Sequence, residues 1–155
     1  MSETAKIRVI ATNKRAWHDY HVLERVEAGI VLGGTEVKSL RAGKANLVDS
    51  YAVFTGGEAF LHSMFINHYD KGNRNNHEER RPRKLLLHKR EIGKLTGQVS
   101  QKGFTVVPLQ LYFKGSHVKV ELGVVRGKKE YDKRHDLKDR ESKREIDRVM
   151  KGGRG

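Results

Sequence analysis

The sequence predicts a mainly β protein, a small closed antiparallel β-barrel with two or three flanking helices and a basic C-terminal tail. Three observations predict this fold. Several short segments alternate apolar and polar residues with a period of two and are separated by glycine-containing turns. Two other segments show helical signals. Residues 126–155 are strongly charged and contain few apolar side chains, so they are expected to lie outside the core.

The first two elements are expected to be a strand and a short helix. The strand covers Tyr20–Val26 and ends before Gly29. Thr35 belongs to a residue type that caps helices, and it is expected to begin a helix that runs through Arg41. Gly43 then supplies a stop signal.

Two β-hairpins are predicted farther along the chain. The first spans Tyr51–Ile66 and turns at Thr55-Gly56-Gly57, and the second turns at Gly115-Ser116. Proline cannot donate a hydrogen bond to a strand ladder, so Pro108 is expected at an edge or a bulge. The second hairpin is expected to bury one apolar face made of Val107, Leu109, Leu111, Phe113, Val118, Val120 and Leu122.

A longer helix is expected between the hairpins, from about Lys84 to Ser100. Its apolar face would comprise Leu85, Ile92, Leu95 and Val99. The two glycines inside this segment each weaken a helix by about 1 kcal/mol relative to alanine. The preceding segment, residues 67–83, is polar and is expected to be a flexible loop. Many short strands with few helices are typical of an oligonucleotide-binding-like barrel.

Charge is the strongest functional signal in the composition. The 155 residues carry 32 Lys and Arg against 19 Asp and Glu, a net charge of +13, of which residues 126–155 contribute +5. Such an excess attracts polyanions. A membrane surface would require a basic amphipathic helix with a continuous apolar face, and the sequence shows none. Nucleic acid is therefore the expected partner.

The sequence also favours a cytoplasmic protein without a cofactor. No apolar run is long enough to span a membrane, and the N-terminal residues lack the apolar core of a secretory signal. The chain has no cysteine, so it has neither disulfides nor thiolate metal ligands.

No catalytic or metal motif is found, so the protein is not expected to be an enzyme. The segment Gly33–Ser39 resembles a phosphate-binding loop, but Val37 stands where that loop requires glycine before lysine. His18 and His21 are expected on opposite faces of a strand, and His77 has no second histidine at zinc-ligand spacing. A metal-independent ribonuclease needs no linear motif and remains an alternative.

Four basic clusters on the body are candidate phosphate contacts. They are Asn13–Arg15, Lys38–Arg41 with Lys44, Arg80–Lys84 and His88–Arg90. A single cluster is more often a solvated face, but several clusters add their phosphate contacts. Trp17, Tyr20 and His88 are candidates for stacking on unpaired bases, although Trp17 could equally fill the barrel.

The body is expected to cover residues 1–125 and the tail residues 126–155. Five sizeable apolar side chains in the tail cannot offset the entropy of ordering it. The tail is therefore expected to be disordered alone and helical against an anionic surface. The alternative is a passive solubilising tail.

Several blocks of this sequence closely resemble the small protein B family, the SsrA-binding proteins of bacteria. They occur in the family's order from about residue 6 to the C-terminus, whereas residues 67–82 match no block of the family. The blocks are Asn13–Ala16, Glu27–Gly29, Gly34–Lys44, Asp49–Tyr51, Arg83–Ile92, Gly127–Lys129 and Asp132–Arg134.

The resemblance implies a function in ribosome rescue. It implies that the protein binds the tRNA-like domain of transfer-messenger RNA and, with elongation factor Tu, brings it to ribosomes stalled on messages without a stop codon. The tail would then enter the vacant mRNA channel of the small subunit as a helix, near the decoding centre. A ribosomal protein or an initiation-type factor on a similar barrel is the alternative from the same class.

The resemblance also adds residues to the candidate site. It implies RNA binding by Glu27, Leu86 and His88. With the basic clusters, the expected RNA-binding residues are Asn13, Lys14, Arg15, Glu27, Lys38, Ser39, Arg41, Lys44, Arg83, Lys84, Leu86, His88 and Lys89. The tail residues expected to contact the ribosome are Lys128, Lys129, Tyr131, Asp132, Lys133 and Arg134.

Overall fold

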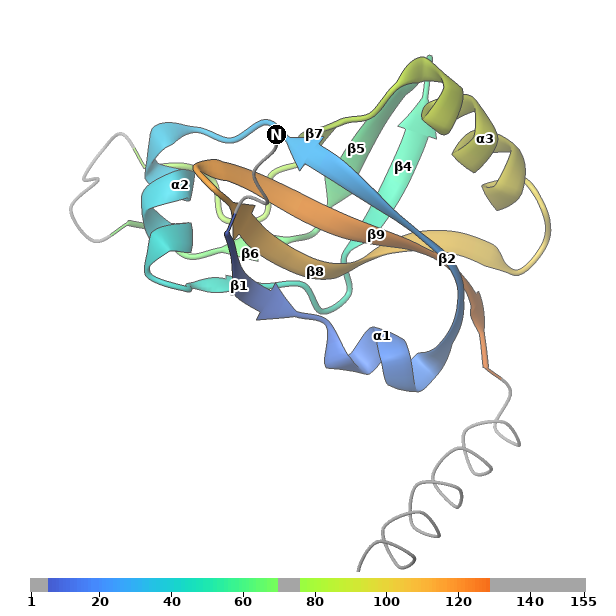
Figure 1. Cartoon of the computed structure of the whole chain (residues 1–155), viewed down its shortest axis with the longest axis horizontal. Coiled ribbons are helices and arrows are strands. Elements are labelled where there is room, and N and C mark those ends of the chain that lie inside the picture. Colours follow the sequence, from blue (N-terminus) through green and yellow to red (C-terminus); the bar gives the residue numbers. More distant parts are fainter. Residues whose placement is uncertain (1–5, 70–75, 129–155) are drawn as a thin grey trace, which may run out of the picture.

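The computed structural model describes residues 6–69 and 76–128, which form a strongly curved antiparallel sheet with three helices around it (Figure 1). The strands are β1 (Ile7–Thr12), β2 (Tyr20–Ile30), β3 (Ala45–Asn46), β4 (Tyr51–Thr55), β5 (Glu58–His62), β6 (Phe65–Ile66), β7 (Arg83–Leu86), β8 (Phe104–Lys114) and β9 (His117–Gly127). The helices are α1 (Lys14–Asp19), α2 (Gly34–Arg41) and α3 (Lys89–Val99). The predicted fold class, mainly β with flanking helices, is confirmed.

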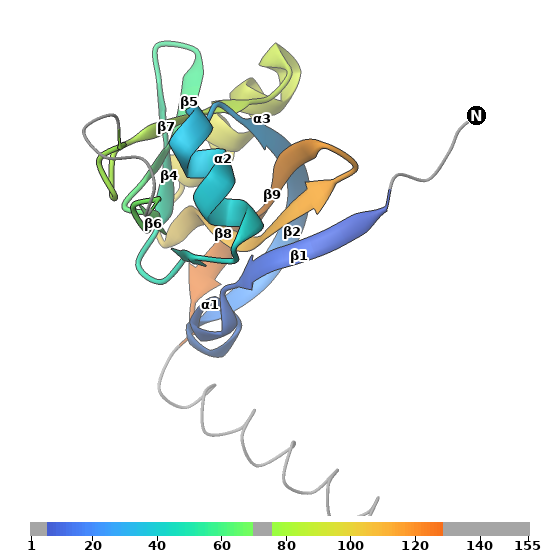
Figure 2. The same cartoon turned by 90° about the vertical axis from the view of Figure 1, so that its left-hand side faces the viewer.

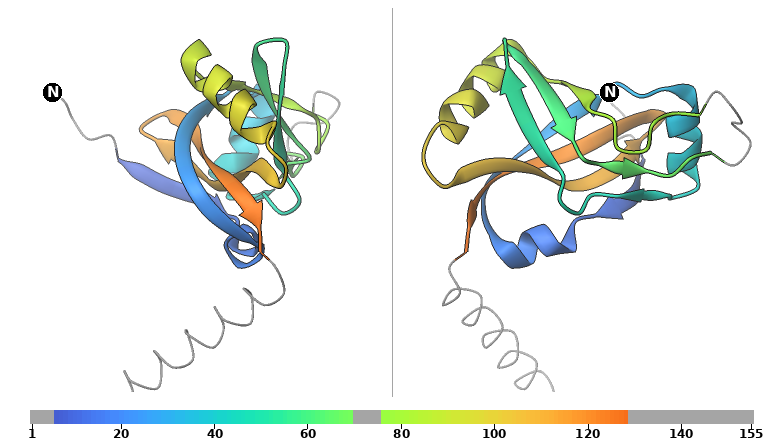
Figure 3. Two further views of the ribbon diagram at one scale, coloured as in Figure 1. Left: turned by 90° about the vertical axis from the view of Figure 1, so that its right-hand side faces the viewer. Right: turned by 180° about the vertical axis from the view of Figure 1, so that it is seen from behind.

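Seven strands form one sheet in the order β1-β8-β9-β2-β7-β5-β4, and β3 and β6 form a separate pair. The long strands β8, β9 and β2 make the curved backbone of this sheet (Figure 2). Within the described residues no ladder joins the outer strands β1 and β4. Instead β4 packs against β8, and the sheet wraps around the interior in this way (Figure 3).

The main core packs one face of the sheet against α2 and α3. Leu40 of α2 and Leu95 of α3 join strand residues such as Leu61 and Val120, and all four are almost completely buried. A smaller core lies on the opposite face, under α1. It consists of Ala16, Val107, Leu109 and Val125.

The predicted hairpin over residues 107–122 is present and longer than expected, because β8 and β9 each have 11 residues. Pro108 sits at a register shift of a central strand, so the predicted bulge is confirmed and the edge alternative is wrong. The bulge also divides the expected apolar face. Leu109 faces the small core, whereas Leu111 faces the main core.

The hairpin over residues 51–66 is confirmed in its first part. Strands β4 and β5 turn at Gly56-Gly57, but Phe65–Ile66 leaves the hairpin and pairs with β3. The strand that begins at Tyr20 continues through Gly29 to Ile30, because its far end pairs with both β9 and β7.

The helix expected over residues 84–100 is wrong in its first turn. Arg83–Leu86 forms strand β7 between β2 and β5, with Arg83 and Leu85 buried and their neighbours exposed. The helix begins only at Lys89, after His88, whose N–H donates to the Glu91 carboxylate at 3.1 Å. Pairing with two strands outweighs the helical spacing of these residues.

Helix α2 begins one residue before its expected cap. Gly33 occupies the N-cap position, and its N–H donates to Glu36 at 2.8 Å, whereas Thr35 lies inside the helix. Gly43 has a φ of 72° and terminates the helix as expected.

Helix α1 was not expected, and it moves His18 from a strand to a helix. It begins after Asn13, whose side-chain oxygen accepts from the Ala16 N–H at 3.1 Å. Trp17 on this helix is 43% exposed, so it does not fill the barrel. Strand β9 extends through Gly127, so the boundary expected after residue 125 falls within the last strand.

Candidate nucleic-acid interface

Most of the expected RNA-binding residues are exposed, and they form three groups on the described body. Lys14 and Arg15 lie on α1. A second group, Lys38, Arg41 and Lys44, lies on α2 and just after it. The third group extends from β7 into α3 and consists of Lys84, Leu86, His88 and Lys89, with Glu27 of β2 beside it.

Three expected contact residues are buried, and their burial gives them structural roles instead. The amide of Asn13 donates to the carbonyl oxygens of Pro108 and Leu47 at 2.9 and 3.4 Å. Ser39 is 1% exposed within α2. Arg83 is completely buried, so it has no surface to offer a phosphate.

The Arg83 guanidinium belongs to an ionic cluster with the buried Glu36 and the partly exposed Arg81. Glu36 accepts from Arg83 Nε at 2.5 Å and from Arg81 Nε at 3.1 Å. Burial alone raises the pKa of Glu36, but the hydrogen bonds from Arg81, the Gly33 N–H and Arg83 outweigh it and lower the pKa. For Arg83 burial has the opposite direction and lowers the pKa, because it disfavours the charged guanidinium. The contacts with Glu36 oppose this shift.

The residues that the family resemblance singled out come together in one surface hollow. Gly29 of β2 pairs with Leu86 of β7, and a Cβ atom on Gly29 would lie only 3.2 Å from the Leu86 Cβ atom. The close approach of these strands brings Glu27, Leu86 and His88 to one place. We call this the Glu27 hollow, and it is lined by Glu27, Gly29, Leu86, Leu87, His88, Glu91 and Lys119.

Glu27 is held in place by two residues of β8. Its carboxylate accepts from the Tyr112 hydroxyl at 2.5 Å and from Lys114 Nζ at 3.2 Å. The Tyr112 hydrogen bond is the main reason that the pKa of Glu27 lies below its ordinary value, with burial opposing it and Lys114 adding to it. Burial, aided by Glu27, raises the pKa of Tyr112, so its hydroxyl stays protonated and able to donate even in alkaline solution.

The sequence pattern alone missed Tyr112 and Lys119 as members of this site. They face one another across the predicted hairpin, and Lys119 in turn pairs with Gly29. In the sequence, both residues lie on the polar side of the hairpin's alternation. The sheet order then places β9, the strand that contains Lys119, beside β2.

The Glu27 hollow suits an unpaired base better than a phosphate. Two carboxylates, Glu27 and Glu91, border it against one lysine, Lys119, so the lining carries a net negative formal charge that disfavours a phosphate group. Carboxylates accept from base amino groups, and apolar or planar side chains pack on exposed bases. Leu86 is 52% exposed and supplies the apolar surface.

We expect Tyr112→Phe to weaken RNA binding by about fivefold, or about 1 kcal/mol, because the Glu27 carboxylate is no longer held in place for the ligand. The variant should also raise the pKa of Glu27, because the main cause of its depression is removed. An NMR titration of the Glu27 carboxyl and an RNA-binding isotherm measure these effects. In a Glu27→Gln background the same change should have no further effect on affinity, and an equal loss there would contradict a role through Glu27.

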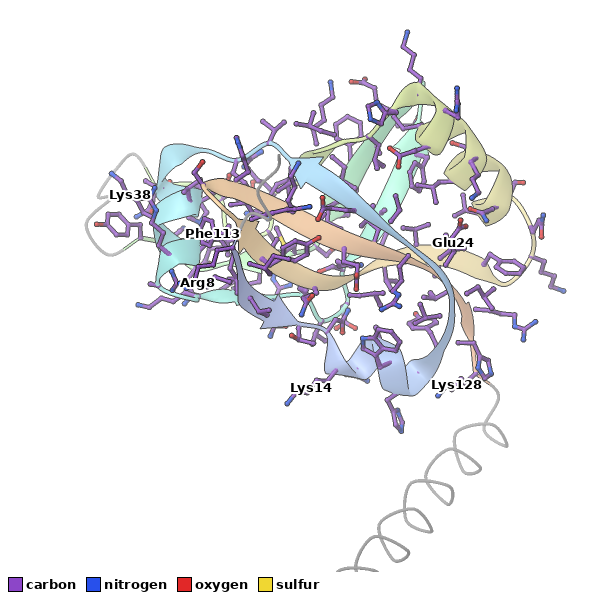
Figure 4. The ribbon with its side chains drawn as sticks, in the orientation of Figure 1. Arg8, Lys14, Glu24, Lys38, Phe113 and Lys128 are labelled. Atoms are coloured by element: carbon purple, nitrogen blue, oxygen red, sulfur yellow. The ribbon has the colours of Figure 1, made fainter. Side chains whose placement is uncertain are left out.

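The first helix, α1, lies beside Lys128, the last described residue. Lys128 donates its N–H to the Asp19 carbonyl at 2.9 Å and its Nζ to the Trp17 carbonyl at 3.4 Å. Figure 4 shows Lys14 and Lys128 at this end of the molecule. The other expected tail residues, Lys129, Tyr131, Asp132, Lys133 and Arg134, lie outside the described residues.

The described part of the chain contains neither a metal-ligand cluster nor a membrane-spanning helix. Residues 6–69 and 76–128 contain no group of three or more histidines and carboxylates placed to hold a metal ion. Within the same ranges no helix has the length and apolar character required to cross a bilayer.

Comparisons with known proteins agree on one family. The model of the SmpB protein family matches residues 10–152. The SsrA-binding protein of Carboxydothermus hydrogenoformans is 55% identical over 144 residues, covering 93% of this chain and 97% of the relative. That of Shouchella clausii is 54% identical over 151 residues, covering 97% of each chain.

A solved structure adds a likeness in three dimensions. Its description is "tmRNA-SmpB: a journey to the center of the bacterial ribosome", and its chain is similar with a TM-score of 0.67 and 54% identity. The match covers 77% of this chain and 85% of that chain. Because the family model and close relatives extend over nearly the whole sequence, this chain belongs to the SmpB protein family.

Proposed function

We propose that this protein is a non-enzymatic cytoplasmic adaptor that binds the tRNA-like domain of transfer-messenger RNA and delivers it to stalled ribosomes. The observation that carries the proposal is the Glu27 hollow, where an oriented carboxylate stands beside the exposed Leu86 on a body rich in positive charge. The relatives' name, SsrA-binding protein, supports this RNA as the ligand. The structure described as tmRNA-SmpB in the bacterial ribosome supports the ribosome as the second partner.

The two parts of the chain would act in sequence. The body would bind transfer-messenger RNA first, and elongation factor Tu would join the delivery complex. On the ribosome, the segment after Lys128 would enter the vacant mRNA channel and become helical near the decoding centre. RNA phosphates in that channel would offset the charge of this basic segment, and binding would offset its ordering entropy.

Binding measurements with transfer-messenger RNA and with ordinary tRNA test the proposal. The full-length protein should bind transfer-messenger RNA more tightly than an elongator tRNA and leave both intact. Fragmentation of either RNA would indicate a ribonuclease. Equal affinity for both RNAs would point to a general RNA-binding protein.

We expect Leu86→Ser to weaken binding of the tRNA-like domain by about tenfold without changing the salt dependence of the affinity. The lost contact is apolar and releases no counterions, and tenfold corresponds to about 1.4 kcal/mol of apolar burial. Leu23→Ser is a matched control, since Leu23 and Leu86 are both 52% exposed on strands. Affinity is measured by titration at several salt concentrations. An equal loss of affinity in the two variants would show that Leu86 is not part of the interface.

A further inference from the structure

A second hollow lies at the opposite end of α2 from the Gly33 cap, where β1 begins beside the β8–β9 turn. Its volume is about 380 Å³, and we call it the Arg8 hollow. Figure 4 shows Arg8 and Phe113 at the end of the molecule near α2, away from Lys14 and Lys128. The lining residues are Lys6, Arg8, Arg41, Phe113, Gly115 and Ser116.

The charge of the Arg8 hollow is entirely positive among its described lining residues. It has three cations and no carboxylate, whereas the Glu27 hollow has two carboxylates and one cation, Lys119. Lys38 and Lys44 extend the positive charge along and beyond α2. The two hollows therefore suit different chemical groups of a ligand.

Arg8 is already oriented for a ligand. Its Nη2 donates to the Arg41 carbonyl oxygen at 2.7 Å, and its guanidinium lies over the Phe113 ring, 6.0 Å from the centroid. The Gly115 N–H donates to the Lys6 carbonyl at 2.9 Å and holds the start of β1 against the turn. A guanidinium has five N–H donors, so most remain for oxygens of a bound group. Fixing the side chain in advance lowers the entropy cost of binding.

We propose that the Arg8 hollow binds a phosphodiester of RNA, at a site separate from the Glu27 hollow. A guanidinium fork matches two oxygens of one phosphate, and the neighbouring lysines suit the phosphates that follow along an RNA backbone. An acidic protein offers carboxylates but no regular line of charges, so RNA fits the extended cationic surface better. The inference rests on the proposed function, because it takes RNA as the ligand of the body.

The test measures affinity against salt for full-length Arg8→Gln and Arg41→Gln, with two RNA probes. One probe is the tRNA-like domain and the other is the isolated small ribosomal subunit. Each variant should reduce the steepness of log affinity plotted against log salt concentration by about one unit with at least one probe, because one phosphate contact is lost. The probe that responds identifies the source of the phosphate. Arg8→Lys should keep the slope but weaken binding, since it keeps the charge and loses the fork.

Lys102→Gln is the matched control, because Lys102 is exposed in the turn before β8 and lies outside both hollows. If Arg8→Gln and Arg41→Gln match this control with both probes while Leu86→Ser weakens binding, the inference fails and the proposed function stands. If the unmodified protein binds neither probe, the proposed function fails as well. Weakened binding of a polyglutamate peptide with unchanged RNA slopes would assign the hollow to an acidic protein and overturn the inference.

Discussion

Ending the chain after Lys128 is expected to abolish peptide tagging on stalled ribosomes and to leave affinity for the tRNA-like domain nearly unchanged. Lys128 is the last described residue, and it contacts Asp19 and Trp17 of the body. All the residues of the two cores and of both hollows precede it. Truncation at this point therefore removes the segment proposed to enter the mRNA channel without removing a described contact of the body.

The family-like motif Asp132-Lys133-Arg134 allows a sharper version of this experiment. Replacing all three residues by alanine should reproduce most of the loss of tagging. The chain offers a matched control in Lys138-Asp139-Arg140, which contains the same three residue types in another order. The control triple alanine variant changes net charge equally and should tag much better, because position and not charge alone decides the contact.

A tagging assay on ribosomes stalled at the end of a truncated message measures both effects, with an RNA titration run on the same proteins. Normal tagging by the truncated protein would mean that the segment after Lys128 only makes the protein more soluble. Loss of RNA affinity on truncation would show that the RNA-binding body extends beyond Lys128. Equal tagging by the two triple variants would mean that only the total charge of this segment matters.

The alternation of apolar residues predicted the main hairpin because its pattern is local. β8 and β9 are adjacent in sequence and joined by a short turn at Gly115-Ser116, so one segment of sequence contains both partners. The bulge at Pro108 was also local, since proline cannot donate to a ladder. The same holds for the end of α2 at Gly43.

The strand Arg83–Leu86 was missed because its cause is distant in sequence. Its leucines fit a helix as well as a strand, and only pairing with β2 and β5 decides between them. This error also affected the candidate site. Arg83 in a basic run resembles a phosphate contact, and its buried partner Glu36 lies 47 residues earlier in the chain.

The residues of the Glu27 hollow also divide into those that the sequence indicated and those that only the fold brings in. The family resemblance drew attention to Glu27, Leu86 and His88 as separate positions. Only the sheet order β8-β9-β2-β7 explains why they meet and why Tyr112 and Lys119 join them. A functional side chain is thus identified by its own sequence block, whereas the residues that orient it are identified by strand neighbours.

Removing the Glu36 carboxylate is expected to destabilise the fold severely. Glu36 and Arg83 are both completely buried, and Arg83 also donates to the carbonyl oxygens of Met64 and Glu79 at 2.6 and 3.1 Å. Glu36→Gln leaves the Arg83 charge buried without its counter-ion, a change that typically costs about 3–5 kcal/mol. The cluster joins α2, β7 and the segment before β7, so its loss loosens all three.

The same cluster makes stability depend on pH in a defined direction. The pKa of Glu36 is lower in the folded chain than its ordinary value of 4.5, so the unfolded chain takes up a proton first as pH falls. The stabilisation from Glu36 is therefore complete above the unfolded pKa and is lost as pH falls through the folded one. Glu36→Gln should remove this part of the acid sensitivity and narrow the stability gap to the unmodified protein at low pH.

Urea unfolding of the full-length protein at neutral and acidic pH measures both consequences, with Glu58→Gln as the control. Glu58 pairs with Lys84 at 2.8 Å, but both side chains are about half exposed, so this pair is worth at most about 1 kcal/mol. Both variants remove one carboxylate charge from an ion pair, but Glu36 is buried against Arg83 and Arg81 whereas Glu58 is half exposed beside Lys84. A free energy of unfolding that falls equally in both would show that the Glu36 carboxylate is solvated in solution. A loss confined to Glu36→Gln, and smaller at acidic pH, would establish that burial of the Arg83 charge makes this carboxylate indispensable to the fold.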